Sequence, residues 1–225
     1  MPASAERKRR DPDASRLALI EATLDSIAED GLGETTVSNI IARAGLSRGM
    51  VHLHFGSKDA LLGEAAHAFS LRYYATMERL LGAAPLPPEV RAMTVVAADL
   101  SPALLNRRDC SIWHAFRGVA SSQPQIARYS STQDDRLVGV LRDALDRLSP
   151  EGPEGRRLAE DATYGTLCLL EGLWAHYTSD PSGFSRPAAA RVVRRLLAAL
   201  YPGRFVGAET EPEALFAAIE ARNGS

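Results

Sequence analysis

The chain has 225 residues, a formal net charge of −2 at pH 7, and ordinary fractions of hydrophobic (45%) and charged (24%) residues. This composition excludes wholesale disorder, and the near-neutral charge means that any signal for nucleic acid has to be local. Two cysteines, Cys110 and Cys168, are too few for a disulfide framework or a zinc site. No apolar run reaches membrane-spanning length, and the polar start at residues 1–16 lacks the apolar core of a secretory signal. We therefore expect a cytoplasmic protein without membrane contact.

The N-terminal part of the sequence predicts a basic arm followed by three helices. Residues 1–15 are polar and charged, and we expect a flexible arm there. Apolar residues then recur with a helical period from Arg16 until Gly31 ends the pattern. Two short helices are expected at Val37–Ala44 and Arg48–Phe55, each preceded by hydroxyl residues that can cap it. Together these elements predict a small domain at residues 16–62.

The rest of the chain predicts longer helices separated by proline and glycine. We expect one helix from Lys58 towards Leu81 and a loose tail from residue 203, with a short helix at Glu213–Ala221. No alternating strand pattern and no internal repeat is found, so the predicted fold class is all-α, with a larger helical domain at residues 63–202. The further helices are expected at Glu89–Leu105, Cys110–Ser122, Gln125–Leu148, Glu154–Thr178 and Pro187–Leu200.

The two short helices have the spacing of a helix-turn-helix, because only Gly45-Leu46-Ser47 separates them. The second helix of such a unit enters the DNA major groove. No acidic residue occurs between Glu34 and Asp59, although this stretch contains arginine, lysine and histidine. A surface that meets phosphates has to be poor in carboxylates, so the gap supports double-stranded DNA as the partner. The alternative is a solvated helical hairpin with a chance gap in charge.

The same stretch resembles the TetR family of repressors. The resemblance rests on Thr35-Thr36-Val37, on Ile40 through Gly49, and on Phe55-Gly56-Ser57-Lys58-Asp59-Ala60-Leu61-Leu62, and it covers residues 16–62. It implies a three-helix DNA-binding domain, a long connecting helix, and a larger domain for ligand binding and dimerisation. Repression rather than activation also follows from the resemblance alone. The chain departs from the family at His52-Leu53-His54, where an aromatic residue and a phosphate-contacting tyrosine are usual.

We predict DNA contacts for the second short helix and its surroundings. Arg48 is the best candidate for a guanine, and Gly49 lets the backbone approach DNA closely. The basic run Arg7–Arg10 could reach a neighbouring groove or simply be solvated, and Phe55 is expected in the core. The expected base contacts are Arg48, Met50, Val51 and His52, the expected phosphate contacts are Thr36, Ser47, His54 and Lys58, and Arg43 is a further basic contact.

Few aromatic residues occur, but several gather on two of the later helices. Around them, Cys110 through Phe116, Ser121 through Pro124 and Leu170 through Trp174 resemble the choline-responsive, BetI-like branch of the family. A quaternary ammonium is recognised by aromatic faces and a nearby carboxylate, so a cationic small-molecule effector is expected. The alternative is an ordinary hydrophobic core with a surface glutamate. The predicted cage consists of Trp113, Phe116, Glu171, Trp174 and Tyr177.

Apolar stripes on two later helices carry the expectation of a homodimer. The resemblance implies that these helices pair with their mates in a four-helix interface, and a two-fold pair can read a palindromic operator. The alternative is that both stripes face the core of one subunit. The stripes are Leu137, Leu141, Ala144, Leu145 and Leu148 on one helix and Leu158, Ala162, Gly165, Leu169 and Leu173 on the other.

No catalytic residue, metal or cofactor is expected. Glu64 and His67 have the spacing of one half of a di-iron motif, but no second copy exists. No nucleophile–base pair, phosphate-binding loop or dinucleotide fingerprint occurs either. Two other functions remain as alternatives: a thiol-based redox regulator using Cys110 and Cys168, and a helical enzyme or scaffold that does not bind DNA.

Overall fold

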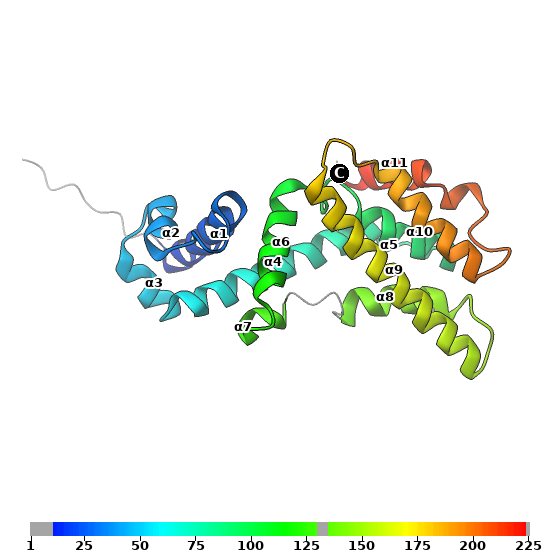
Figure 1. Ribbon diagram of the computed structural model, residues 1–225, viewed down its shortest axis with the longest axis horizontal. Coiled ribbons are helices and arrows are strands. Elements are labelled where there is room, and N and C mark those ends of the chain that lie inside the picture. Colours follow the sequence, from blue (N-terminus) through cyan, green and yellow to red (C-terminus); the bar gives the residue numbers. More distant parts are fainter. Residues whose placement is uncertain (1–10, 130–134, 224–225) are drawn as a thin grey trace, which may run out of the picture.

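The computed structural model describes residues 11–129 and 135–223 of an elongated, helical molecule. Helices α1 (Pro12–Asp30), α2 (Val37–Ala44) and α3 (Arg48–Phe55) form a group at one end (Figure 1). Helix α4 (Lys58–Leu81) leaves this group and runs into a larger bundle at the other end. The described ranges contain no strand, which confirms the all-α class, and none of their helices is long and apolar enough to cross a membrane.

Local capping interactions begin the helices of the N-terminal group. The hydroxyl of Thr36 accepts a hydrogen bond from the amide of Asn39 at the start of α2, over 3.2 Å. Gly45 ends that helix with φ of 62°, a left-handed conformation that favours glycine. The hydroxyl of Ser57 caps α4 through the amide of Ala60, over 3.1 Å. These caps fix the short turns on either side of α3.

The larger bundle is built around α5 (Pro88–Asp99), whose side chains are buried from Ala92 to Asp99. Helix α4 and several later helices pack around it. The later helices that contact α5 are α8 (Asp135–Asp146), α10 (Arg186–Leu200) and α11 (Pro212–Asn223). The domain also contains α6 (Arg107–Val119), α7 (Pro124–Ala127), α9 (Pro153–Ser179) and a 3₁₀ turn (Ala208–Thr210).

Helices α1 and α5 do not have the predicted limits. Helix α1 begins at Pro12, inside the expected arm, because Asp11 caps it; the basic run at residues 7–10 lies outside the described residues. Helix α5 ends at Asp99 rather than Leu105, since Pro102 has no amide hydrogen to continue it.

The single helix expected at residues 125–148 is also wrong. Its ends belong to α7 and α8, with residues 130–134 outside the described ranges. The physical reason is that the two pieces serve different cores. Ile126 of α7 packs with the N-terminal group, whereas Leu141 of α8 packs in the larger bundle. One straight helix does not reach both.

The C-terminal segment is not a loose tail, as we had expected from residue 203 onward. Phe205, Leu215 and Ile219 are buried in the same core as α5. The guanidinium of Arg222 donates to the carbonyl oxygen of Leu80 at the end of α4, over 2.8 Å. The segment orders because Leu215 and Ile219, one helical turn apart, present an apolar face to the bundle.

Candidate functional site

Helix α3 presents one exposed face and one buried face. Arg48 and His52 are exposed and lie one turn apart. Gly49 and Leu53 form a second exposed pair with the same spacing, and Leu53 is 72% exposed. Open space surrounds the α-carbon of Gly49, so DNA can approach the helix backbone there. Leu53 was not among the predicted contacts, although its four-residue spacing from Gly49 places it on the same exposed face.

Val51 points into the protein, so its predicted base contact is wrong. Its side chain is 4% exposed and belongs to the apolar core of the N-terminal group, together with Ile40 of α2. Met50 is half-buried and packs against the same core. The reason is that a helix of only eight residues needs an apolar face of its own to stay attached to α2 and α4.

Three predicted phosphate contacts surround α3 in accessible positions. Thr36 and Ser47 are exposed at the N-cap positions immediately before α2 and α3. The hydroxyl of Ser47 makes no capping hydrogen bond to α3. Lys58 is half-buried at the first turn of α4, where helix amides and the ammonium can hold an anion together.

Two other predicted contacts have different surroundings. Arg43 forms ion pairs with Glu29 (2.7 Å) and Asp30 (2.9 Å), which raise the pKa of its guanidinium and compensate its charge. His54 is half-buried, and its Nε2 atom is enclosed without a hydrogen-bond partner among the described residues. The Nε2 atom of His54 is therefore not placed to meet a phosphate in this conformation, whereas Arg43 is exposed but already paired with two carboxylates.

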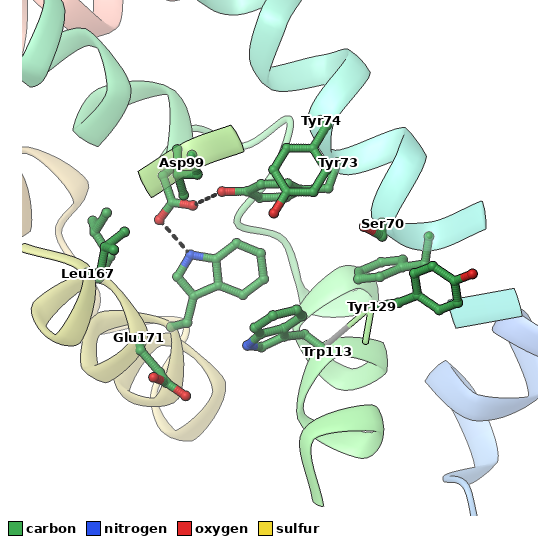
Figure 2. A pocket seen from close by; sticks show the side chains of 12 residues that line it. Ser70, Tyr73, Tyr74, Asp99, Trp113, Tyr129, Leu167 and Glu171 are labelled. Atoms are coloured by element: carbon green, nitrogen blue, oxygen red, sulfur yellow. Dashed lines mark hydrogen bonds between the residues drawn. The ribbon is translucent and has the colours of Figure 1, made fainter. Parts of the chain in front are cut away.

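A pocket lies in the larger domain, between α4, α5, α6, α8 and α9 (Figure 2). About 620 Å³ of space lies between its lining residues, a figure that includes open solvent. Six aromatic side chains contribute to its wall. The lining residues are Phe69, Ser70, Tyr73, Tyr74, Asp99, Trp113, Tyr129, Leu137, Leu167, Leu170, Glu171 and Trp174.

The aromatic residues of the pocket form an edge-to-face cluster. The ring centroids of Trp113 and Trp174 are 6.2 Å apart, with an interplanar angle of 63°. Tyr73 contacts Trp174 with a centroid distance of 6.3 Å and meets Tyr74 at 88°. Such contacts hold the rings in fixed orientations. The wall is therefore rich in aromatic surface before any ligand arrives.

Asp99 is a buried carboxylate at one end of this cluster (Figure 2). It is 4% exposed and accepts hydrogen bonds from the hydroxyl of Tyr73 (2.6 Å) and from Nε1 of Trp174 (2.9 Å). Burial raises the pKa of Asp99 to about 6, although both hydrogen bonds act in the opposite direction. Both donors are neutral, and Asp99 forms no ion pair within the described residues. Its negative charge is thus uncompensated.

Glu171 is a second carboxylate in the lining, with different surroundings. It forms an ion pair with Arg117 of α6, and the side chains of both residues are 34% exposed. The guanidinium of Arg117 also lies 5.7 Å from the ring centroid of Trp113. Arg117 therefore compensates the charge of Glu171 at the edge of the pocket.

The structure brings together three of the five predicted cage residues: Trp113, Glu171 and Trp174. Phe116 lies elsewhere, 1% exposed in the core shared with the N-terminal group, because its helix packs against α1. Tyr177 also lies outside the lining, against Phe184 and Arg186.

Four important residues of the lining were missed from the sequence. Tyr73 and Tyr74 are adjacent on α4, which we expected only to connect the two domains, and Tyr129 follows α7. Asp99 ends the apolar run of α5, and a single acidic residue in such a run was the available signal. Nothing in the sequence alone shows that these elements converge.

The two cysteines have different environments, and both are free thiols. Cys110 is 1% exposed, and burial raises the pKa of its thiol to about 12. A thiol with such a pKa is rarely ionised and therefore a poor redox sensor. Cys168 is exposed on α9. Among the described residues, no group of histidine, cysteine and carboxylate side chains could hold a metal ion.

Two family models match the chain in consecutive regions. Residues 19–65 match bacterial regulatory proteins of the tetR family, and residues 88–202 match the C-terminal domain of BetI-type transcriptional repressors. The first region contains α2 and α3, and the second contains Asp99 and four of the pocket's helices.

Curated relatives agree with these matches. The HTH-type transcriptional regulator BetI of Stenotrophomonas maltophilia is 31% identical over 159 residues, which is 71% of this chain and 79% of the relative. The regulator of the same name from Burkholderia mallei is 34% identical over 160 residues, with coverage of 71% and 79%.

Solved structures show the same fold. A transcriptional regulator from Pseudomonas aeruginosa PAO1 has a TM-score of 0.72 and 26% identity, covering 89% of this chain and 97% of its own. A regulator from Saccharomonospora viridis, solved in complex with choline, has a TM-score of 0.65 and 19% identity, with coverage of 82% and 96%.

These matches confirm the predicted transcriptional repressor and exclude the alternative of a helical enzyme, because the family consists of regulators. The chain belongs to the TetR family of bacterial transcriptional regulators and carries the C-terminal domain of its BetI-type repressors.

Proposed function

We propose that this repressor binds a palindromic operator as a homodimer and is released when a small organic cation occupies the aromatic pocket. One observation carries the proposal: helix α4 belongs to both sites. It begins at Lys58 beside α3, and it contributes Phe69, Ser70, Tyr73 and Tyr74 to the pocket wall. A ligand that moves α4 therefore moves the DNA-binding helices of its subunit as well. Bacterial operator DNA places this activity in the cytoplasm.

Direct reading of DNA bases falls to the exposed face of α3. Arg48 can donate two hydrogen bonds to O6 and N7 of guanine, and the apolar side chain of Leu53 suits a thymine methyl group. His52 lies on the same face, but its Nδ1 atom is 2.9 Å from the carbonyl oxygen of Gly56, so only Nε2 is directed outward for DNA. Thr36, Ser47 and Lys58 are the proposed phosphate contacts, which set the register of the helix on DNA.

The chemistry of the pocket favours a cation as the effector. Aromatic faces attract a cation by about 0.5–2 kcal/mol for each contact, and more when water is excluded. Trp174 offers such a face and Asp99 adds a negative charge, whereas the ring of Trp113 already has the guanidinium of Arg117 over it. The choline complex of the regulator from Saccharomonospora viridis supports a quaternary ammonium. The redox alternative has less support, since the thiol of Cys110 is buried.

The proposed dimer interface lies on α9 and α10 rather than on α8. The stripe expected on α8 is satisfied within one subunit, because Leu141, Ala144 and Leu145 are buried there. On α9 and α10, by contrast, Tyr164 is 64% exposed and Val192 is 51% exposed. These two helices lie side by side (Figure 1). Tyr164 and Val192 are the proposed contacts with the same helices of a second subunit.

Selection of bound sequences from a random DNA pool, followed by binding in the presence of effectors, tests the proposal. We expect a palindromic consensus and a two-fold complex by light scattering. Choline is expected to lower operator affinity by about 5–150-fold, the usual range of allosteric coupling. The uncharged isostere 3,3-dimethylbutan-1-ol is the matched control and is expected to have little effect. A monomer that binds no duplex at low ionic strength would contradict the proposal.

A further inference from the structure

The pocket contains two carboxylates, and only one of them has a cationic partner. Glu171 is bound by Arg117, which also covers the ring of Trp113. Asp99 receives hydrogen bonds from Tyr73 and Trp174, which carry no charge. Figure 2 shows the carboxylate of Glu171 directed away from Asp99, so the two groups do not act as one pair. Among the described residues, the buried carboxylate of Asp99 therefore has no cationic partner, and a cationic ligand could supply one.

We propose that Asp99, and not Glu171, selects a cationic effector, by supplying a negative charge that only the ligand neutralises. This inference rests on the proposed function and assigns charge selection to one residue of its pocket. A buried carboxylate without a counter-ion loses hydration, and attraction to a nearby cation is strong where water is excluded. An uncharged ligand of the same shape fills the same space but leaves this charge uncompensated. Charge selection thus follows from the surroundings of Asp99.

The hydrogen bonds of Asp99 also connect charge to the shape of the pocket. Each carboxylate oxygen accepts one bond, Oδ1 from Tyr73 and Oδ2 from Trp174. Those two residues form part of the aromatic wall, with their rings in edge-to-face contact. Asp99 therefore orients two of the rings that would surround the cation. Loss of the carboxylate is expected to affect both charge recognition and the order of these rings.

Other charged groups near Asp99 do not replace a ligand cation. Cys110 of α6 is close enough to be affected by Asp99, and its buried thiol is neutral at physiological pH. The same thiol lies near Asp109, which is negative, and near Arg186. The guanidinium of Arg186 donates instead to the carbonyl oxygen of Leu105 and lies over Tyr177, outside the lining of the pocket. None of these three groups neutralises the charge of Asp99, so a cationic ligand would have to do so.

Titration calorimetry with the full-length protein tests the inference, using choline and 3,3-dimethylbutan-1-ol as probes of equal shape. We expect the wild type to prefer choline by more than tenfold. In Asp99→Asn this preference should fall to about threefold or less. The double variant Glu171→Gln/Arg117→Met removes the ion pair without leaving an unpaired charge, so it should keep the preference. Loss of the preference in the double variant, with its retention in Asp99→Asn, overturns the inference but leaves the proposed function intact.

A second measurement keeps the inference testable if Asp99→Asn folds poorly. Asparagine has only one acceptor oxygen, so either Tyr73 or Trp174 would lose its hydrogen-bond acceptor. Wild-type calorimetry in buffers of different ionisation enthalpy counts the protons released on binding. Measured at several pH values from pH 4.5 to pH 7, binding of choline is expected to release protons, since it ionises the Asp99 molecules that are still protonated. Release of no protons at any of these pH values overturns the inference. Absence of any cation binding, with operator binding intact, instead overturns the effector assignment of the proposed function.

Discussion

Arg108 on α6 binds Asp25 on α1 through two nitrogens of its guanidinium, at 2.7 and 3.1 Å from Oδ1. The contact joins the N-terminal group to a helix that carries part of the pocket wall. The carboxylate of Glu21 on α1 lies 3.4 Å from the guanidinium groups of both Arg108 and Arg72. The carboxylate of Asp109 lies 3.4 Å from the guanidinium of Arg108 and 3.7 Å from that of Arg72. We call these five residues the interdomain ion network. It is the polar part of the connection through which a change at the pocket can reach α1.

Arg108→Met is expected to weaken the effect of choline on operator binding. The substitution keeps the apolar stem but removes the charge that ties α6 to α1. Residues between coupled sites change the coupling by about 0.5–2 kcal/mol, whereas partly exposed ion pairs add only about 0.2–1 kcal/mol to stability. Fluorescence anisotropy of a labelled operator, with and without choline, measures the coupling.

The matched control for that prediction is Arg147→Met. Arg147 directly follows α8 and forms an ion pair with Asp143 of that helix at 2.9 Å, so it connects no domains. We expect its coupling to equal that of the wild type. Equal coupling in Arg108→Met would show that the ion network transmits nothing.

Arg48→Ala is expected to reduce discrimination at one base pair of each half-site by about 1–3 kcal/mol. Arg48 is exposed and forms no ion pair within the described residues, so its guanidinium is available to a base. Arg43→Ala is the control, since Arg43 is bound by Glu29 and Asp30. Binding to a panel of single-base operator variants measures the effect. Equal loss of affinity on every variant would assign Arg48 to phosphate instead.

Val51→Ala and Leu53→Ala are expected to have opposite consequences, although the residues are two positions apart on α3. Val51 is 4% exposed, so its truncation should cost roughly 2 kcal/mol of unfolding free energy through lost burial and a cavity. Leu53 is 72% exposed, so its truncation should change stability by less than about 0.5 kcal/mol. Only Leu53→Ala should lower the preference for a thymine. Urea unfolding and the operator panel separate the two outcomes.

The residues that sequence reasoning placed well are those fixed by local rules. The limits of α2 and α3 follow from Thr36, Gly45 and Gly56, whose capping and left-handed conformations depend on their immediate neighbours. Val51 shows where this reasoning stopped. Its position on a short helix was read as exposed, because the sequence did not show which face packs against α2 and α4.

The candidate pocket depended more on tertiary structure than the DNA-binding helices did. Trp113 and Trp174 were found because aromatic residues are few, but their neighbours come from helices far apart in sequence. Asp99 lies 75 residues from Trp174, and only the packing of α5 against the bundle brings them together. Glu171 was the more visible carboxylate in sequence, yet Arg117 compensates it across 54 residues. Convergence of this kind is not encoded in local spacing.

Choline affinity is expected to fall about tenfold between pH 7.5 and pH 5. Burial raises the pKa of Asp99 from 3.8 to about 6, so the carboxylate is mostly protonated at pH 5 and ionised at pH 7.5. The charge of choline is fixed, and its affinity therefore follows the ionised fraction of Asp99. Glu171 also lines the pocket, but no histidine does so among the described residues. Calorimetry at pH 5, 6 and 7.5 measures the profile, and a flat profile would contradict it.

The raised pKa of Asp99 also affects how the stability of the protein depends on pH. The effect is opposite to that of an ion-paired carboxylate, whose pKa is lowered by folding. Ionisation of Asp99 is less favourable in the folded than in the unfolded protein. Its contribution to stability is therefore greatest below pH 3.8 and decreases as the pH rises through about 6. Asp99→Asn should remove this dependence from unfolding experiments and also flatten the pH profile of choline binding.

Val192→Asp is expected to convert the dimer to a monomer and to abolish high-affinity operator binding. Val192 is 51% exposed on α10, and in the proposed interface it would be buried against the second subunit, where a carboxylate without a partner is strongly unfavourable. One helix α3 then reads a single half-site, and the affinity gained from two linked half-sites is lost. Val206→Asp is the control, because Val206 is 72% exposed but lies outside α9 and α10. Sedimentation analysis together with circular dichroism measures association and folding. A folded Val192→Asp dimer with full operator affinity would place the interface on another surface.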